Sequence, residues 1–449
     1  MHQDVPHLLL INPWIDDFAA YDFWARPLGL LSLGAILRKL GYKISFIDCL
    51  DRFHPKLNKS SRSGRFGTGH YLKTPIPKPE GLGDVPRRYS RYGLPEALVR
   101  EALAGCPRPD VVLVTSLMTY WYPGVLATIN VVADMLPGVP IVLGGIYAGL
   151  CREHAIRHAG VDHVVTGTDD ALAVDLIGRL TGFSADAGWN PEDLDTFPYP
   201  CFDLQHALPY VPILTSRGCP FRCPYCASGL LFPGWVRRSA EHVVNEIVYW
   251  HEAYGVRDVA FYDDALLYDA DNHIVPILEG IIRANVRVRF HTPNAVHIRF
   301  LTSRVAGLLF LETVRLSPKA GPDLKVGPEE FERAVSILKA AGFSGHSVGA
   351  YLLCGLPGQD EKELETSIQV VKAAGVKPVL AQYSPIPGTA LWPVAVESSR
   401  YDLASDPIFH NNSIFPCRKS PFSWEWISRL KRLAAASPDS GVDSEQSLR

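Results

Sequence analysis

Short, uninterrupted runs of apolar residues alternate with helix-like stretches along this chain, and this alternation restricts the folds open to it. Apolar runs of this length are typical of strands buried on both faces of a parallel sheet. In the first half they lie at residues 8–11, 43–47, 111–114, 139–143 and 163–165, with helical stretches at 28–40, 123–135 and 148–158 between most of them. We therefore expect an α/β fold whose residues 1–181 form a doubly wound, Rossmann-like sheet.

Ligands of such sheets bind at the carboxyl ends of the strands. The third and fourth expected strands are followed by loops that begin with Thr115-Ser116 and with Gly144-Gly145. We therefore expect these four residues to contact any ligand of the first half.

The same strand–helix rhythm resumes six times after a connector at 182–210 that is rich in Pro, Gly, Asp and Phe. Strands are expected at 212–216, 258–263, 286–292, 313–317, 347–353 and 379–383, and helices at 239–254, 273–284, 328–341 and 361–374. Six units are too few for a closed eight-stranded TIM barrel. We expect a second domain over residues 211–395, then a cap over 396–449 that ends in a disordered Ser-, Asp- and Gly-rich tail.

One loop carries three closely spaced cysteines, Cys219, Cys223 and Cys226, in a CxxxCxxC pattern. Three thiolates can bind three irons of a cubane cluster, and without a fourth cysteine one iron stays open to a ligand. A structural zinc site would need a second pair of Cys or His ligands. A two-cluster ferredoxin motif would need a cysteine where Leu230 stands. Disulfide frameworks are typical of small secreted chains, so the pattern favours a 4Fe–4S cluster.

This loop, with Tyr225 just before the last cysteine, resembles the signature of the radical S-adenosylmethionine (SAM) enzymes. The resemblance implies an open, six-unit partial (β/α)6 barrel with its active site at the strand carboxyl ends. It implies that SAM binds the open iron and that the reduced cluster cleaves SAM to a 5′-deoxyadenosyl radical. An external electron donor such as flavodoxin or ferredoxin would then be a partner.

The resemblance also assigns cofactor contacts to the ends of the later strands. Asp263 and Asp264 are candidates for binding the SAM ammonium group, with a helix-capping turn as the alternative. Asn294 would approach SAM or substrate, and Ser317 would approach the SAM carboxylate. The expected contacts beside the adenine are made by Gly355 and Tyr383.

Three further residues at these strand ends keep two interpretations each. His291 could carry a proton, although a satisfied core histidine is the more common case. Lys319 stands where relatives commonly have a glutamate, so it either grips a carboxylate or is an ordinary surface lysine. Cys354 either points into the barrel or is a packed thiol.

The first half resembles the cobalamin-binding domain that precedes many radical SAM barrels, through residues 109–112, 115–124, 143–145 and 162–167. No Asp-x-His-x-x-Gly box is present to supply a histidine to cobalt. The resemblance therefore implies cobalamin without a histidine ligand from this domain. A Rossmann-like domain that has lost the cofactor is the alternative.

Residues 52–105 interrupt the strand–helix rhythm of the first half. They carry seven Lys or Arg and no acidic residue between positions 52 and 79. A solvated, mobile loop is one interpretation, and a lid that meets the cobalamin nucleotide or an anionic substrate is the other.

Composition narrows the function classes. The 449 residues are 47% hydrophobic with a formal net charge of −3, which gives no general attraction to nucleic acid. No apolar run reaches the roughly 18 residues of a membrane span, so we expect a cytoplasmic protein that does not insert into a membrane. We expect cobalamin-dependent methyl transfer to an unactivated carbon of a small molecule or peptide. Radical cyclisation or rearrangement is the alternative, and a non-catalytic iron–sulfur electron-transfer or scaffold protein is an alternative of another class.

Overall fold

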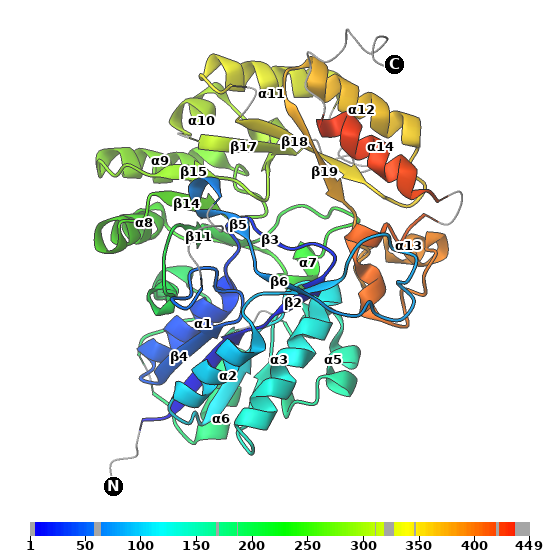
Figure 1. Cartoon of the computed structure of the whole chain (residues 1–449). Coiled ribbons are helices and arrows are strands. Elements are labelled where there is room, and N and C mark those ends of the chain that lie inside the picture. The colour runs from blue at the N-terminus through cyan, green and yellow to red at the C-terminus, as the bar shows by residue number, and fades with distance from the viewer. Residues whose placement is uncertain are drawn as a thin grey trace.

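The computed structural model describes residues 5–57, 64–167, 170–185, 187–309, 311–317, 327–344, 347–418 and 422–435, of which 311–317 are described by their backbone alone. Figure 1 shows two α/β units, the first in blue and cyan and the second from green to red, with the orange segment around α13 lying beside both. Within the described ranges, no helix is long and apolar enough to cross a bilayer.

The first unit is a five-stranded parallel sheet in the order β10-β9-β8-β1-β4. Its strands are β1 (His7–Asn12), β4 (Lys43–Asp48), β8 (Val111–Val114), β9 (Ile141–Leu143) and β10 (His163–Val164). Numbered along the chain this is the flavodoxin-like order 2-1-3-4-5, and the direction of winding reverses between β1 and β8. A ligand of this sheet is therefore expected above that pair of strands.

Helices cover both faces of this sheet, which explains its uninterrupted apolar strands. One face packs on α2 (Glu96–Gly105), α3 (Tyr122–Met135), α4 (Ile146–Leu150) and α5 (Arg152–His158), and the other on α1 (Leu28–Lys39) and α6 (Asp170–Thr181). The doubly wound sheet predicted from the sequence is confirmed. The single helix expected over 148–158 is two helices, which meet at Cys151 with φ −122° and ψ 44°.

The second unit is a curved parallel sheet in the order β11-β14-β15-β17-β18-β19. Its strands are β11 (Val211–Ile213), β14 (Asp258–Phe261), β15 (Arg289–His291), β17 (Leu311–Ser317), β18 (Val348–Cys354) and β19 (Lys377–Gln382), and the short β16 (Val296–His297) pairs with β17. The helices on its outer face are α8 (Ala240–Tyr254), α9 (Ile274–Arg283), α10 (Ser303–Leu308), α11 (Pro328–Ala340), α12 (Glu361–Ala373) and α14 (Trp424–Ala435). They bury one continuous core against the sheet.

The strand expected at 212–216 divides in two. After β11 the chain leaves the sheet and forms β12 (Ser216–Gly218), which pairs antiparallel with β13 (Trp235–Arg237). The short helix α7 (Ser228–Leu231) lies between these two strands in the sequence. We call residues 214–237 the cysteine arm, because the three cysteines lie within it.

Helix α1 belongs to the cores of both units. Leu30, Ile36 and Leu37 pack on the first sheet, whereas Leu31 and Ala35 pack against the core of the second unit. An interface that shares a hydrophobic core resists relative domain motion. The two units are therefore held in a fixed relation.

The described part of the basic insertion is folded, so the mobile-loop interpretation is wrong there. Its strand β5 (Gly69–His70) pairs with β3 (Tyr21–Asp22), and β7 (Ser90–Tyr92) lies between β6 (Lys73–Pro75) and β2 (Ile15–Asp17) and pairs with both. Arg52 pairs with Asp22, and Arg91 pairs with Asp16. The acidic partners come from the segment after β1, which a count over the insertion alone could not detect.

The segment after β19 returns to the first unit. It contains α13 (Trp392–Ser398) and the 3-10 turns η8 (Pro407–His410) and η9 (Asn412–Ile414). His410 Nδ1 lies 3.1 Å from Thr119 Oγ1, and Asn411 donates to Asp17 Oδ1 at 2.8 Å. The expected disordered tail, from residue 436 onwards, lies outside the described residues.

Candidate active site

The three cysteines lie on the loop between β12 and α7, partly exposed. Gly218 directly precedes the first of them, with φ +81°, and a Cβ there would lie 2.2 Å from the carbonyl oxygen of Gly234. Only glycine fits this position without displacing the paired strand. The last residue of β12 is thus packed closely against the chain before β13, and the cysteine loop begins directly after it.

The polar surroundings of the loop suit thiolate ligands. The Ser228 N–H donates to Cys226 Sγ at 3.5 Å, and Ser228 Oγ lies 3.1 Å from the same sulfur. Among the described residues, no three His, Cys, Asp or Glu side chains are close enough to bind a single metal ion.

Two tyrosines are associated with this loop: Tyr225, which is partly buried, belongs to it, and Tyr383 is buried. Tyr225 packs against the cluster of buried side chains that contains Tyr383, the residue after β19. Burial raises the pKa of both phenols, and the Cys223 thiol adds to the shift of Tyr225. Neither hydroxyl meets a hydrogen-bond partner of normal geometry within the described structure. Buried polar atoms of this kind fit a site completed by a bound ligand.

Asp263 is hydrogen-bonded to the base of the cysteine arm. It accepts hydrogen bonds from the backbone N–H and the hydroxyl of both Thr215 and Ser216, at 2.6–3.1 Å. The carboxylate is 1% exposed. Most of these bonds fall on Oδ1, and the contact of Asp263 to the SAM ammonium group stays a prediction.

The other predicted strand-end residues are distributed around the open edge of the barrel. Asp264 and Asn294 are exposed, and Asn294 donates to Tyr262 O at 2.7 Å. Gly355 follows β18 with φ +86°. Ser317 is the last residue of β17, and Lys319 lies outside the described residues.

Two of the residues with open interpretations are structural. His291 is fully buried, lies 2.8 Å from Asp258 Oδ1 and stacks on Trp24 with ring centroids 4.2 Å apart. Cys354 is 0% exposed and belongs to the core under the outer helices. The core-histidine and packed-thiol alternatives are therefore the ones that the structure supports.

The four residues predicted in the first unit lie at neighbouring strand ends. Ser116 donates through Oγ to Gly144 O at 2.7 Å, and its own carbonyl accepts from Ile146 at 2.8 Å. A Cβ on Gly145, where φ is +95°, would lie 2.2 Å from Ser116 O. Thr115 N donates to Ile11 O across the switch between β8 and β1.

The adjoining loop exposes apolar side chains at this edge. Leu117 is 44% exposed and Met118 is 40% exposed, directly after Ser116. Corrin is a large ring that a polar, closed edge could not accommodate, whereas exposed apolar side chains at the switch point can contact it. These residues fit cobalamin.

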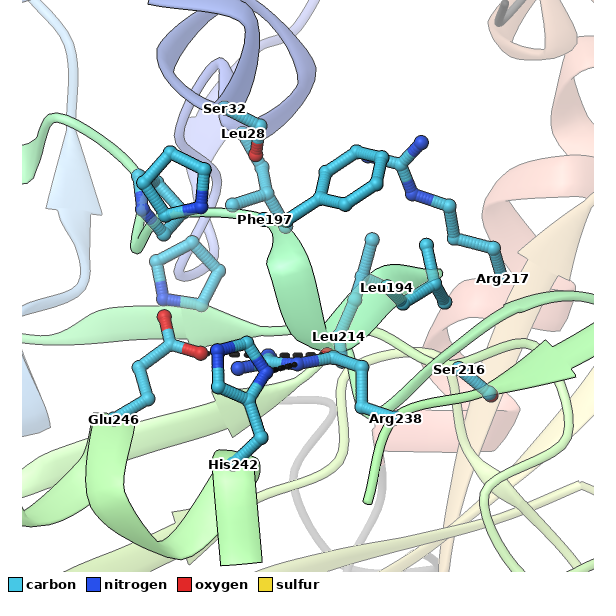
Figure 2. A pocket seen from close by; sticks show the side chains of 13 residues that line it. Leu28, Ser32, Leu194, Phe197, Leu214, Ser216, Arg217, Arg238, His242 and Glu246 are labelled. Carbon is cyan, nitrogen blue, oxygen red and sulfur yellow. Dashed lines mark hydrogen bonds and ion pairs between the residues drawn. The ribbon is translucent and has the colours of Figure 1, made fainter. Parts of the chain in front are cut away.

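The base of the arm contacts both units. Arg217 Nη1 lies 2.6 Å from Asp170 Oδ2 at the start of α6. Figure 2 shows Arg217 and Ser216 beside the connector residue Phe197 and the α8 residues His242 and Glu246. The cavity that they line is about 50 Å³, enough for a few water molecules but not for a cofactor.

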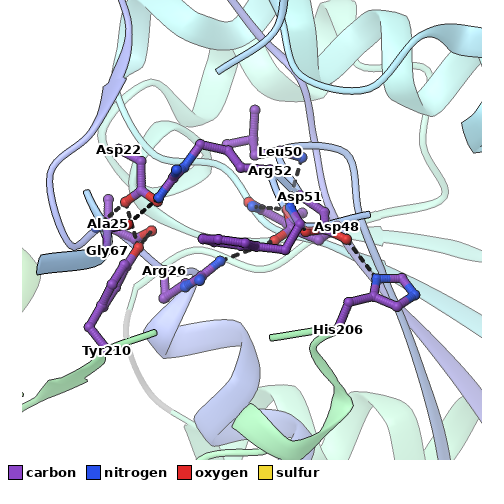
Figure 3. Close-up of polar contacts among 12 residues, drawn as sticks. Asp22, Ala25, Arg26, Asp48, Leu50, Asp51, Arg52, Gly67, His206 and Tyr210 are labelled. Carbon is purple, nitrogen blue, oxygen red and sulfur yellow. Dashed lines mark hydrogen bonds and ion pairs between the residues drawn. The ribbon is translucent and has the colours of Figure 1, made fainter. Parts of the chain in front are cut away.

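A buried polar cluster joins the units on the side of β1 and β4 (Figure 3). Arg52 donates to Asp22 Oδ2 at 2.6 Å and 2.8 Å, and Tyr210 also donates to Asp22. The Arg26 guanidinium lies 4.7 Å from the centre of the Tyr210 ring and 4.0 Å from Asp48. These contacts link the insertion, the first sheet and the residue before β11.

Family comparisons match both units. Residues 213–371 match the family model of the Radical SAM superfamily, and residues 90–177 match that of the B12 binding domain. The chain is a B12-binding radical SAM enzyme. The expectation of an enzyme is thereby confirmed, and the alternative of a non-catalytic iron–sulfur protein is not supported.

Relatives of this B12-binding radical SAM enzyme include an uncharacterized methyltransferase, PH0819, of Pyrococcus horikoshii, 24% identical over 73% of this chain and 78% of that protein. The cytidylyl-2-hydroxyethylphosphonate methyltransferase of Streptomyces wedmorensis is 21% identical over 86% of this chain and 80% of its own length. The structure of the radical SAM methyltransferase TsrM from Kitasatospora setae, with cobalamin and a [4Fe-4S] cluster bound, superposes with a TM-score of 0.67 at 14% identity, covering 96% of this chain and 91% of TsrM. At that identity the match shows a shared fold.

As a member of this family the enzyme uses a 4Fe–4S cluster, SAM and cobalamin. The cluster supplies the electron that cleaves SAM, and cobalamin carries a methyl group. Sequence reasoning missed Thr215, Ser216 and Arg217 as residues that hold the site. The sequence feature that could have indicated them is the Thr-Ser-Arg-Gly run that directly precedes Cys219.

Proposed function

We propose that this enzyme transfers a methyl group from SAM, through cobalamin, to an unactivated carbon of a small molecule or peptide. Cys219, Cys223 and Cys226 would hold the cluster, and Tyr225 and Tyr383 would border SAM. Thr115, Ser116, Gly144 and Gly145 would lie along the cobalamin edge. Within the barrel, Asn294, Ser317 and Gly355 stay candidates for SAM contacts.

One observation carries this proposal: the cysteine arm rests directly on the cobalamin-type edge. A Cβ on Gly149, in the helix that follows Gly144-Gly145, would lie 3.9 Å from Leu231 Cδ2, in the helix that follows the last cysteine. Arg217 pairs with Asp170 from the other end of the arm. A cluster and a corrin held on these facing edges could share one substrate and one pool of SAM.

The relatives from Pyrococcus horikoshii and Streptomyces wedmorensis are both named methyltransferases, which favours methyl transfer over cyclisation or rearrangement. Cleavage of SAM needs an electron, so a flavodoxin or ferredoxin is the proposed partner. None of the nine cysteines, all within the described ranges, forms a disulfide. Thiols persist in reducing compartments, which supports a cytoplasmic location.

Cobalt stoichiometry after anaerobic reconstitution with hydroxocobalamin tests the proposal. We expect near-stoichiometric cobalt in the wild type and a reduced amount in Leu117→Gln, which makes the apolar edge polar. The matched control is Leu172→Gln, because Leu172 is 55% exposed on α6. Equal cobalt in both variants would contradict a contact of Leu117 with the corrin. No cobalt in a wild type that holds a full cluster would favour cobalamin-free cyclisation or rearrangement.

A further inference from the structure

Asp263 accepts several hydrogen bonds from the base of the cysteine arm. Its Oδ1 accepts from Ser216 Oγ at 2.6 Å, from Ser216 N at 2.7 Å and from Thr215 Oγ1 at 2.8 Å. Thr215 N adds a bond shared between both oxygens at 3.0 Å and 3.1 Å. Burial raises the pKa of this carboxyl, and the donated hydrogen bonds oppose that shift. Four donors from two consecutive residues fix the direction in which the chain leaves β11.

A buried histidine completes this arrangement. His273 Nε2 lies 2.7 Å from Thr215 Oγ1. The threonine hydroxyl has one hydrogen and gives it to the carboxylate, so it must accept from His273 Nε2–H. Burial lowers the pKa of His273 to about 4, so the ring is neutral. The result is a directed chain of hydrogen bonds from His273, just before α9, through Thr215 to Asp263, just after β14.

Only two residues separate Ser216, which Asp263 binds, from the first cysteine, Cys219. Arg217 is tied to Asp170 in the first unit, and Gly218 is pressed against Gly234. The direction of the Ser216 backbone is therefore passed on to Cys219 with little freedom. We propose that Asp263 is a positioning residue, which sets the cysteine loop in the conformation that binds the cluster.

This inference rests on the cluster and not on methyl transfer. Asp258, the first residue of β14, offers a matched comparison, because Asp263 lies two residues after the end of the same strand. It is 4% exposed and takes hydrogen bonds from Arg289 and His291, on β15 rather than on the arm. A general loss of packing would affect both positions, whereas a loss of cysteine positioning would affect Asp263 alone.

The test compares Asp263→Asn with Asp258→Asn. On the cluster-free proteins, amide hydrogen exchange at Thr215 and Ser216 should become roughly tenfold faster in D263N, because charge-assisted buried bonds are lost. D258N should keep the wild-type rate there. After reconstitution, D263N should show a lower iron content and an altered electron paramagnetic resonance spectrum of the reduced cluster, with D258N unchanged.

Thr215→Val provides a second variant if D263N does not fold, since it removes one donor and retains the side-chain shape. It should shift exchange and spectrum in the same direction, and Thr215→Ser should restore both. Wild-type exchange at 215–216 in D263N and T215V, or equal cluster defects in D263N and D258N, would overturn the inference. Absence of a cluster from the wild type would contradict the proposed function instead, while the exchange data would still decide the role of Asp263.

Discussion

Arg217 and Asp170 form an ion pair of 2.6 Å between the base of the cysteine loop and the first turn of α6. The two side chains are 22% and 15% exposed, so solvent screens the pair only in part. Arg217 also lies 4.7 Å from the centre of the Phe197 ring in the connector. Arg217, which belongs to the cysteine arm, thus contacts both the connector and the cobalamin-type domain.

Loss of this ion pair should change how the two domains work together in the reaction, while the stability of the fold should change little. We expect Asp170→Asn and Arg217→Gln each to lower the free energy of unfolding by about 1 kcal/mol or less. Their double mutant should lose little more than either alone. The ratio of S-adenosylhomocysteine to 5′-deoxyadenosine, measured by chromatography, should fall in all three. An unchanged ratio would contradict a coupling role.

Cys223→Ala should abolish cluster-dependent SAM cleavage and leave the fold intact, because two thiolates cannot hold a cubane firmly. Iron content and 5′-deoxyadenosine yield after anaerobic reconstitution are the measurements. The control is Cys106→Ser, at a partly exposed cysteine after α2. Wild-type nucleoside yield from the Cys223 variant would refute the assignment of the cluster ligands.

Gly218→Ala should distort the arm. The new Cβ would lie 2.2 Å from a backbone oxygen at a residue with φ +81°, a strain of about 1–3 kcal/mol. Gly229→Ala, on the same arm, is the matched control, since a Cβ there would meet no described atom within 4 Å. Thermal unfolding and iron retention should fall for the first variant only. Equal thermal unfolding and equal iron retention in the two variants would show that the close approach of residue 218 to Gly234 does not matter.

His410 should make stability depend on acid pH. Burial lowers its pKa to about 4, partly offset by the bond to Leu403 O and by Asp406. Between pH 6.5 and 4 the unfolded chain takes up this proton and the folded chain does not, so stability falls as the pH falls. Buried Asp48, with its pKa raised to about 6, acts oppositely in this range, so only a comparison with a variant isolates His410. The stability advantage of wild type over His410→Gln in urea should shrink by about 2 kcal/mol from pH 7.5 to 4.5. A constant advantage would contradict this.

Much of the fold was predictable because both sheets are buried on both faces. Residues 8–11 are fully buried, and helices cover them from each side, so their sequence had to be an uninterrupted apolar run. The CxxxCxxC spacing was equally informative, since it depends on local chain geometry alone.

The contacts that failed to follow from the sequence are those between distant segments. Nothing near Asp263 in the sequence indicates that its carboxylate faces Thr215 and Ser216, 47 or more residues earlier. The basic insertion looked mobile because its acidic partners, Asp16 and Asp22, precede it by more than 25 residues. Side-chain direction at a strand end depends on the tertiary neighbours, which a local pattern does not encode.

The measurement that tests the central claim most directly is a count of cofactors and products on one preparation. Iron, cobalt, S-adenosylhomocysteine and 5′-deoxyadenosine would be quantified after anaerobic reconstitution with cobalamin and reductant. The account predicts about four irons and one cobalt per chain, with S-adenosylhomocysteine formed only when cobalt is bound. A full cluster with no bound cobalt, or S-adenosylhomocysteine formation independent of cobalt, would contradict it.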